Sequence, residues 1–120
     1  MLELCVSVGP NVGLLIDSWH WYTAHATIED IQALTAEQVV YVHVNDAPAG
    51  VPVDEQINDQ RSLHGETGII DLPGFLHALR NIGYDGPVTP DPFINEFTSQ
   101  PPQEVLECTG RVFDHVWAMA

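Results

Sequence analysis

Two stretches of this sequence place metal-binding and proton-transferring side chains beside runs of aliphatic residues. In the first, LLIDSWH, the aliphatic run ends at Asp17, and His20 follows three residues later. In the second, VVYVHVND, a valine-rich run contains His43 and leads into Asn45 and Asp46. Carboxylate oxygens and imidazole nitrogens bind divalent cations, and both groups also move protons. The two stretches therefore predict a metal or acid–base site, provided that the aliphatic runs are neighbouring strands.

A third candidate ligand and a candidate substrate-binding residue lie further along the chain. Asp91 ends the apolar stretch PVTPD, and Arg61 lies in the connection 46–70. That connection has about 25 residues, a length that in compact domains is typical of functional or disordered loops. Asp91 thus repeats the pattern of a carboxylate at the end of an apolar run.

Each of these residues also has an ordinary structural interpretation. Asp17 is equally typical of a turn or helix cap, and His43 of a hydrogen-bonded core histidine. His20, which lies between two tryptophans, could simply pack against them, and Arg61 could be a solvated loop charge. The metal interpretation is favoured because three candidate ligands, Asp17, His43 and Asp91, occupy matching places in three apolar runs.

The length and composition indicate one globular domain over residues 1–120. Hydrophobic residues make up 45% of the 120, which is enough for an ordinary core. No apolar run approaches the ~18 residues of a membrane span, and the first residues lack the features of a signal peptide. We therefore expect a cytoplasmic protein with no membrane partner.

The charge balance argues against nucleic acid as a partner. Seventeen acidic residues face three arginines and no lysine, for a formal net charge of −14. Phosphate binding requires a basic surface, which this composition does not provide. The acidity is compatible with divalent cations, but solubility or a salty environment explains it as well.

Three strands and three helices are predicted to position the candidate residues. The strands are 11–17, 39–45 and 87–91, and the first two are almost continuously hydrophobic, as in a parallel sheet covered by helices. Helical signals follow each strand. Thr27 and Asp30 resemble a capping box before IEDIQAL, Asp71 precedes LPGFLHALRNIG, and two prolines open a helix through about Met119.

The alternation of strand and helix predicts parallel βαβ units, in which ligand sites gather at the carboxyl ends of the strands. Asp17, His43 and Asp91 all lie at such ends. Strand alternation further predicts that Val39 and Tyr41 share the face of His43. The other three valines of that strand, Val40, Val42 and Val44, are then expected to face the helices.

Taken as a series, the motifs resemble the second half of the xylose isomerase-like TIM barrels, a superfamily of sugar isomerases and epimerases related to AP endonucleases. The resemblance rests on NVGLLIDSWHW, VYVHVNDA, RSLHGETGIIDL, ALRNIGYDGPV and PDPF, which together span roughly residues 9–94. It implies an α/β fold in which the strands correspond to the sixth, seventh and eighth of a (β/α)8 barrel. Residues 1–9 would be the end of the preceding helix, although their alternating aliphatic residues also fit a short strand.

The resemblance also implies roles for individual residues. In that family a divalent cation is held by a fifth-strand glutamate, an aspartate, a histidine and a final glutamate. Asp17, His43 and Asp91 match the last three, with Asp91 also the catalytic carboxylate. His20 and Arg61 match residues that bind the substrate. The ligand types suit Mn, Mg, Co or Zn, so they do not specify which metal binds.

Three departures from the family pattern affect the expected activity. Asp91 replaces a glutamate and is one methylene, about 1.5 Å, shorter; a displacement of that size can cost on the order of 100-fold in rate. The usual PGEG becomes HGET at residues 64–67. The fifth-strand glutamate has no equivalent here, since a whole barrel needs about 250 residues.

The function that the resemblance implies is a metal-dependent sugar or sugar-phosphate isomerase or epimerase, incomplete in this chain alone. The alternative, from another class, is a non-catalytic barrel remnant or assembly module that still holds a cation. A role in DNA repair fits the acidic composition poorly. Because three strands from a barrel leave unpaired edges and an uncovered apolar face, we expect a homo-oligomer.

Overall fold

The protein contains a three-stranded parallel sheet in the order β1–β2–β3, as the sequence predicted. The structure is a computed structural model, which describes residues 1–91, 97 and 99–119. The strands are β1 Leu14–Asp17, β2 Val39–Val44 and β3 Val88–Pro90. They lie within the predicted ranges and are one to three residues shorter at individual ends. Of the motif PDPF, Pro92 and Phe93 lie outside the described residues.

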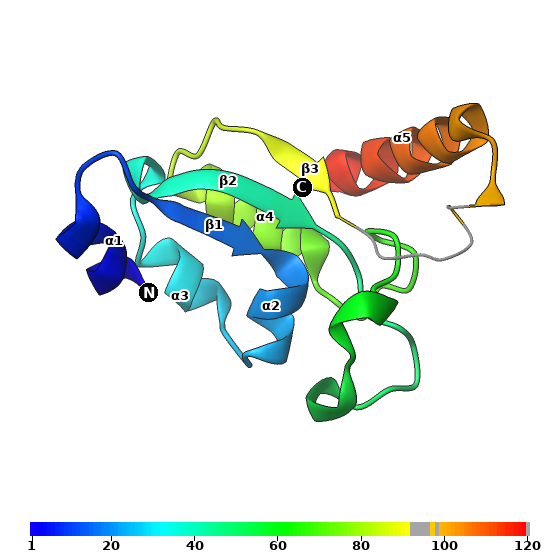
Figure 1. The fold of residues 1–120 in the computed structure, drawn as a ribbon, viewed down its shortest axis with the longest axis horizontal. Coiled ribbons are helices and arrows are strands. Elements are labelled where there is room, and N and C mark those ends of the chain that lie inside the picture. Colours follow the sequence, from blue (N-terminus) through cyan, green and yellow to red (C-terminus); the bar gives the residue numbers. More distant parts are fainter. Residues whose placement is uncertain (92–96, 98, 120) are drawn as a thin grey trace.

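Among the described residues, five α-helices accompany the sheet (Figure 1). They are α1 Leu2–Val8, α2 Ser18–Thr23, α3 Ile28–Gln32, α4 Leu72–Asn81 and α5 Pro102–Met119. The three helices predicted from the sequence are α3, α4 and α5. Residues 2–8 are helical, so the alternative of a short N-terminal strand is wrong. The short helix α2, which begins directly after β1, was not predicted.

Local capping interactions explain where the predicted helices begin. Thr27 and Asp30 form a reciprocal capping box at the start of α3, with the Thr27 hydroxyl accepting from the Asp30 amide. At α4 the Asp71 carboxylate accepts a 3.0 Å hydrogen bond from the Gly74 amide. Both interactions satisfy backbone N–H groups that would otherwise lack partners at a helix start.

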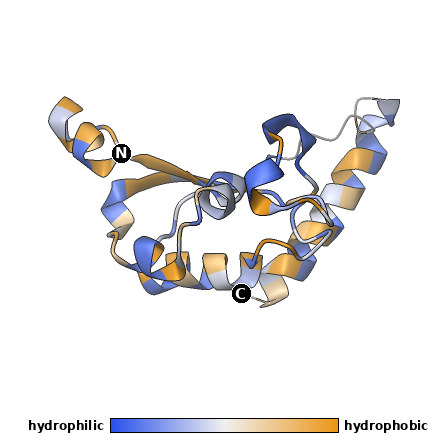
Figure 2. Cartoon of the chain, turned by 90° about the horizontal axis from the view of Figure 1, so that it is seen from below, coloured by the Kyte–Doolittle hydropathy of each residue, from blue (hydrophilic) through white to orange (hydrophobic). Residues whose placement is uncertain are grey.

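The helices cover one face of the sheet and build the core there. Figure 2 shows most helices gathered below the strands, while hydrophobic α1 projects to one side. In the core, Val42 and Val44 from β2 are fully buried against aromatic and aliphatic side chains of α4. Phe75 and Leu79 are among the buried residues that α4 contributes. One-sided coverage of parallel strands is the arrangement of a partial (β/α)8 barrel.

The predicted facing of β2 is wrong at its first two residues. Val39 is buried in the core, whereas Val40 is 52% exposed, although it was expected to face the helices. The cause is an irregularity in the register, where Leu14 pairs with Val39 but Leu15 pairs with Tyr41. The extra residue in β2 reverses the alternation locally. From Val42 onward the prediction is confirmed.

The opposite face of the sheet is open among the described residues. Leu15 and Val40 are each 52% exposed, and Tyr41 beside them is half-buried. The helix α1 exposes three further aliphatic side chains, Leu4, Val6 and Val8. In a closed barrel this face would lie inside against other strands. Apolar surface is therefore exposed at the position where the barrel interior would be.

The long connection 46–70 is held against the strand ends by Asp46. This buried carboxylate accepts hydrogen bonds from the amides of Thr67, Gly68 and Ile70 at 2.7–3.0 Å. Its backbone also forms an antiparallel bridge with Ser62. Asp46 therefore has a structural role, and it fixes the part of the connection that carries Arg61.

A buried histidine joins the same connection to the last helix. His64 has no exposed surface and packs edge-on against Phe113 of α5, with ring centroids 5.1 Å apart. Burial lowers the pKa of His64, although the Thr109 backbone and the negative charge of Asp46 oppose this effect. The His64 ring is consequently neutral at neutral pH, which suits its apolar surroundings.

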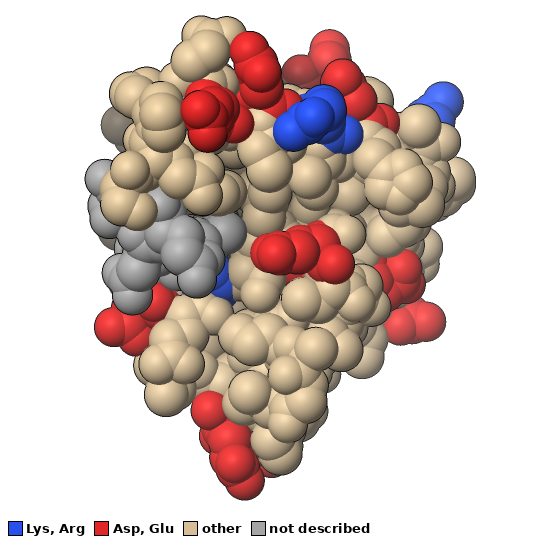
Figure 3. Space-filling model, turned by 90° about the vertical axis from the view of Figure 1, so that its right-hand side faces the viewer, with Lys and Arg blue, Asp and Glu red and all other residues tan. Residues whose placement is uncertain are grey.

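Acidic side chains outnumber basic ones at the surface. Figure 3 shows them distributed over one face of the molecule, with few basic groups among them. The absence of lysine and the net charge of −14 account for this. Within the described part of the chain, no helix combines the length and apolar character needed to cross a membrane.

Candidate functional site

Asp17 serves both as a helix cap and as a site residue, because its two carboxylate oxygens have different partners. Oδ1 accepts hydrogen bonds from the amides of Trp19 (2.9 Å) and His20 (3.0 Å), which begins α2. Oδ2 accepts from Arg61 Nη1 at 2.9 Å and from Asn45 Nδ2 at 3.2 Å. The cap interpretation and the site interpretation of Asp17 therefore both describe the structure.

The structure brings the three candidate metal ligands together. Asp17 ends β1, His43 lies one residue before the end of β2, and Asp91 follows β3 directly. His43 Nδ1 lies 3.7 Å from Asp17 Oδ2 and 3.3 Å from Asp91 Oδ2. One ligand atom from each of the three lies within 4.8 Å of the others. Parallel pairing of adjacent strands accounts for this convergence.

Arg61 lies at the centre of this group rather than in solvent. Its side chain is only 4% exposed, and Nη1 donates to both Asp17 Oδ2 (2.9 Å) and Asp91 Oδ2 (3.0 Å). Nη2 lies 3.0 Å from His20 Nε2 and donates to Asn58 Oδ1 at 2.6 Å. The alternative that Arg61 is a solvated loop charge is therefore wrong.

The two tryptophans beside His20 have packing roles. Trp19 is buried in the core, and its ring lies beneath the guanidinium of Arg61 at 5.0 Å. Trp21 packs edge-on against Phe75 and donates from Nε1 to the Thr27 carbonyl oxygen. His20 meets the Trp19 ring edge-on, so it both packs and faces Arg61.

Three supporting residues were not assigned roles from the sequence. Asn45 is fully buried and directs Nδ2 to Asp17, while its Oδ1 and backbone amide both bond to the Ser18 hydroxyl at 2.9 Å. Asn58 holds Arg61 from an exposed short helix. Ser18 and Asn45 adjoin predicted strand ends, which is a usable signal. For Asn58, the sequence signal is limited to its spacing, three residues before Arg61.

The donor set fits a divalent cation. Two carboxylate oxygens and one imidazole nitrogen are the ligand types used by Zn²⁺ and Mn²⁺ in proteins. The side chains of His43 and Asp91 are 27% and 34% exposed and partly face solvent, whereas that of Asp17 is 5% exposed. Three protein ligands leave further positions for water or another ligand.

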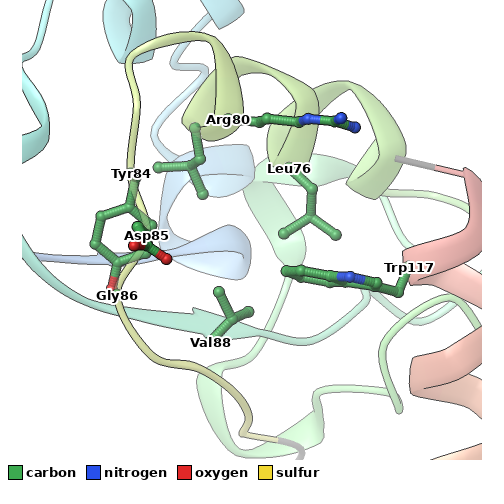
Figure 4. A pocket seen from close by; sticks show the side chains of 8 residues that line it. Leu76, Arg80, Tyr84, Asp85, Gly86, Val88 and Trp117 are labelled. Carbon is green, nitrogen blue, oxygen red and sulfur yellow. The ribbon is translucent and has the colours of Figure 1, made fainter.

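A separate hollow lies away from these residues, at the amino end of β3. Its volume is about 390 Å³, and Leu76, Val88 and Trp117 point into it from α4, β3 and α5 (Figure 4). Exposed Arg80 and Asp85 stand at its margin. None of the candidate site residues lines this hollow. Asp17, His43 and Asp91 lie instead at the carboxyl ends of the strands, where barrel sites form.

Curated relatives include enzymes that act on small molecules. The chain is 28% identical over 97 residues to the inosose isomerase of Bacillus subtilis (strain 168), covering 81% of this chain and 34% of that protein. It is 31% identical over 84 residues to the ketose 3-epimerase of Arthrobacter globiformis, covering 70% and 25%. The chain therefore spans about a third or less of these relatives' lengths.

Structural comparison gives the same fold. The crystal structure of the IOLI protein with a bound zinc atom matches with a TM-score of 0.85 and 26% identity. The match covers 96% of this chain and 41% of that one, so the three strands form part of a barrel. The family model for the xylose isomerase-like TIM barrel matches residues 1–109. The chain thus belongs to the xylose isomerase-like TIM barrel family.

Proposed function

We propose that Asp17, His43 and Asp91 hold a divalent cation in the active site of a sugar or sugar-phosphate isomerase or epimerase. The convergence of these three side chains within 4.8 Å carries the proposal. Support comes from the names of the isomerase and epimerase relatives, and from the zinc atom in the structural relative. Mn, Mg, Co and Zn all remain compatible with the donor set.

The residues of this chain would have distinct roles in the reaction. A cation held by Asp17, His43 and Asp91 would polarise the carbonyl oxygen of a substrate, which would acidify the hydroxyl-bearing carbon next to the carbonyl. Arg61 and His20, 3.0 Å apart beside the two carboxylates, are positioned to donate hydrogen bonds to substrate oxygens. The Asp91 carboxylate, 34% exposed, is the group that would accept or return the proton.

The site in this chain is proposed to be one part of a larger one. Three protein ligands leave the coordination of a cation open, and epimerisation at a carbon uses an acid–base group on each face of the substrate. The family resemblance assigns the fourth ligand to a preceding strand. The second candidate function, a non-catalytic assembly module that keeps the cation, is favoured by the aspartate at position 91.

Metal binding by the 120-residue chain tests the proposal. Titration calorimetry with Mn²⁺ or Zn²⁺ is expected to show one weak site, and His43→Ala should weaken it at least tenfold because an imidazole ligand is lost. His115→Ala is the matched control, since His115 is an exposed histidine of α5. Equal binding by the wild type and His43→Ala would refute the proposed site.

We also propose that the open face of the sheet pairs with a second copy of the chain. Leu15, Val40 and Tyr41 expose apolar surface there, at a cost of about 25 cal/mol per Å² when left in water. Light scattering should give a dimer, and Val40→Asp should shift it to the 13.2 kDa monomer. Val51→Asp, on the long connection, should leave the dimer intact. A wild-type monomer at micromolar concentration contradicts this proposal.

A further inference from the structure

The hydrogen bonds of Asp17 use every lone pair that its carboxylate offers. An ionised carboxylate has about four acceptor positions, two on each oxygen. Oδ1 uses both of its positions on the amides of Trp19 and His20, which begin α2. Oδ2 uses both of its positions on Arg61 Nη1 and Asn45 Nδ2. A cation that takes Asp17 as a ligand must therefore displace one of these four donors.

From this count we infer that Arg61 and a divalent cation bind the Asp17–Asp91 carboxylate pair in alternation, with Arg61 leaving when the cation enters. The inference rests on the proposed cation site and deepens it. In this role Arg61 is an internal counter-ion, which offsets the repulsion between the two negatively charged carboxylates before the metal binds. The cation would thus release the guanidinium that the substrate needs, so that cation binding precedes substrate binding.

Arg61 is the donor that can leave at the smallest structural cost. The Trp19 and His20 amides belong to the helix start, and Asn45 is fully buried and bonded to Ser18 through its side chain and backbone. Arg61 instead comes from the 46–70 connection, and the contacts described for it beyond the carboxylates are with side chains: Asn58 and His20 at Nη2, and the Trp19 ring beneath the guanidinium. Rotation of one side chain therefore frees Asp17 Oδ2, whereas displacing the other donors disrupts the helix or the core.

The charges of the group give the same exchange a driving force. Arg61 Nη1 bridges Asp17 Oδ2 and Asp91 Oδ2 at 2.9 and 3.0 Å, so one positive charge offsets two negative charges. A divalent cation offsets both charges fully, and at the short metal–oxygen distance of about 2.1 Å its attraction is stronger. Both oxygens that Arg61 bridges belong to the proposed ligand set, so the exchange restores a complete counter-charge.

Binding measurements on the full 120-residue chain separate this exchange from other roles of Arg61. Asn58→Ala keeps the charge of Arg61 but removes its 2.6 Å anchor, and it should tighten Mn²⁺ binding about fivefold. Arg61→Met should tighten it at least tenfold. Gln60→Ala, an exposed neighbour on the same short helix, should leave the affinity unchanged. Unchanged or weaker binding in Asn58→Ala overturns the inference.

Hydrogen exchange provides a second readout. Simple repulsion between the Arg61 charge and the cation would change the Mn²⁺ affinity but not the amide exchange rates. Saturating Mn²⁺ should increase amide exchange in residues 57–62 of the wild type, because the segment loses its Arg61 anchor. Arg61→Met should show no such increase. Reduced or unchanged exchange in the metal-bound wild type overturns the inference while leaving the cation site intact. If neither protein binds Mn²⁺, the cation site and the inference both fail.

Discussion

Replacing Asp17 with alanine is expected to lower the free energy of unfolding by about 3–5 kcal/mol, because a buried ion pair would lose one partner. The side chain caps α2 through Oδ1 and receives the 4%-exposed Arg61 through Oδ2. Alanine removes the cap and leaves the guanidinium with less counter-charge. Chemical denaturation followed by circular dichroism measures the change.

Two further variants define what the Asp17 result means. Asp114→Ala, at an exposed position of α5, should change the unfolding free energy by no more than about 0.5 kcal/mol. Asp17→Asn retains an acceptor oxygen for the cap but loses the charge, so its effect should be smaller than that of alanine. If Asp17→Ala is no more destabilising than Asp114→Ala, the structural role assigned to Asp17 is wrong.

A second large effect is expected in the catalytic rate of the 120-residue chain. The purified 120-residue chain is expected to show no substantial metal-dependent turnover of ketoses, inososes or their phosphates, because the family resemblance places the second acid–base carboxylate on a strand that the described residues do not include. The described residues place one partly exposed carboxylate, Asp91, beside His43 and Arg61. Loss of one of two acid–base groups typically costs 10²–10⁴-fold in rate.

The assay for this prediction combines product analysis with metal dependence. Isomer formation is followed by chromatography at saturating Mn²⁺, with Asp91→Asn as the matched control that removes the remaining base. Wild type and Asp91→Asn should be equally inactive. Robust turnover that Asp91→Asn abolishes would contradict the proposed incompleteness and would show that another carboxylate of this chain serves as the second base.

The sequence predicted the sheet and the places of Asp17, His43 and Asp91 at the strand ends because both depend on strong, local signals. Aliphatic runs followed by Asp17 or Asp91 indicate parallel strands whose ends meet, and parallel pairing then brings the side chains together. Capping residues such as Thr27 and Asp71 identified two helix starts for the same reason. The partial (β/α)8 fold is confirmed by the family match over residues 1–109 and by the structural comparison.

Features that depend on tertiary contacts could not be predicted in this way. The helix α2 has only six residues, rich in aromatic and polar side chains, so its stability comes from the Asp17 cap and from packing of Trp19. The irregular register before Tyr41 reverses the facing of Val40 without a local sequence signal. The anchoring of Arg61 by Asn58 likewise arises only when the long connection folds over the strand ends.

Spectroscopy of the bound metal shows directly whether Asp17, His43 and Asp91 bind the same divalent cation. Pulsed electron paramagnetic resonance of the Mn²⁺-loaded chain detects nitrogen atoms bound directly to the metal. We expect coupling to one histidine nitrogen, which disappears in His43→Ala and persists in His115→Ala. Mn²⁺ without nitrogen coupling in the wild type, or coupling that survives in His43→Ala, would contradict the site at these strand ends.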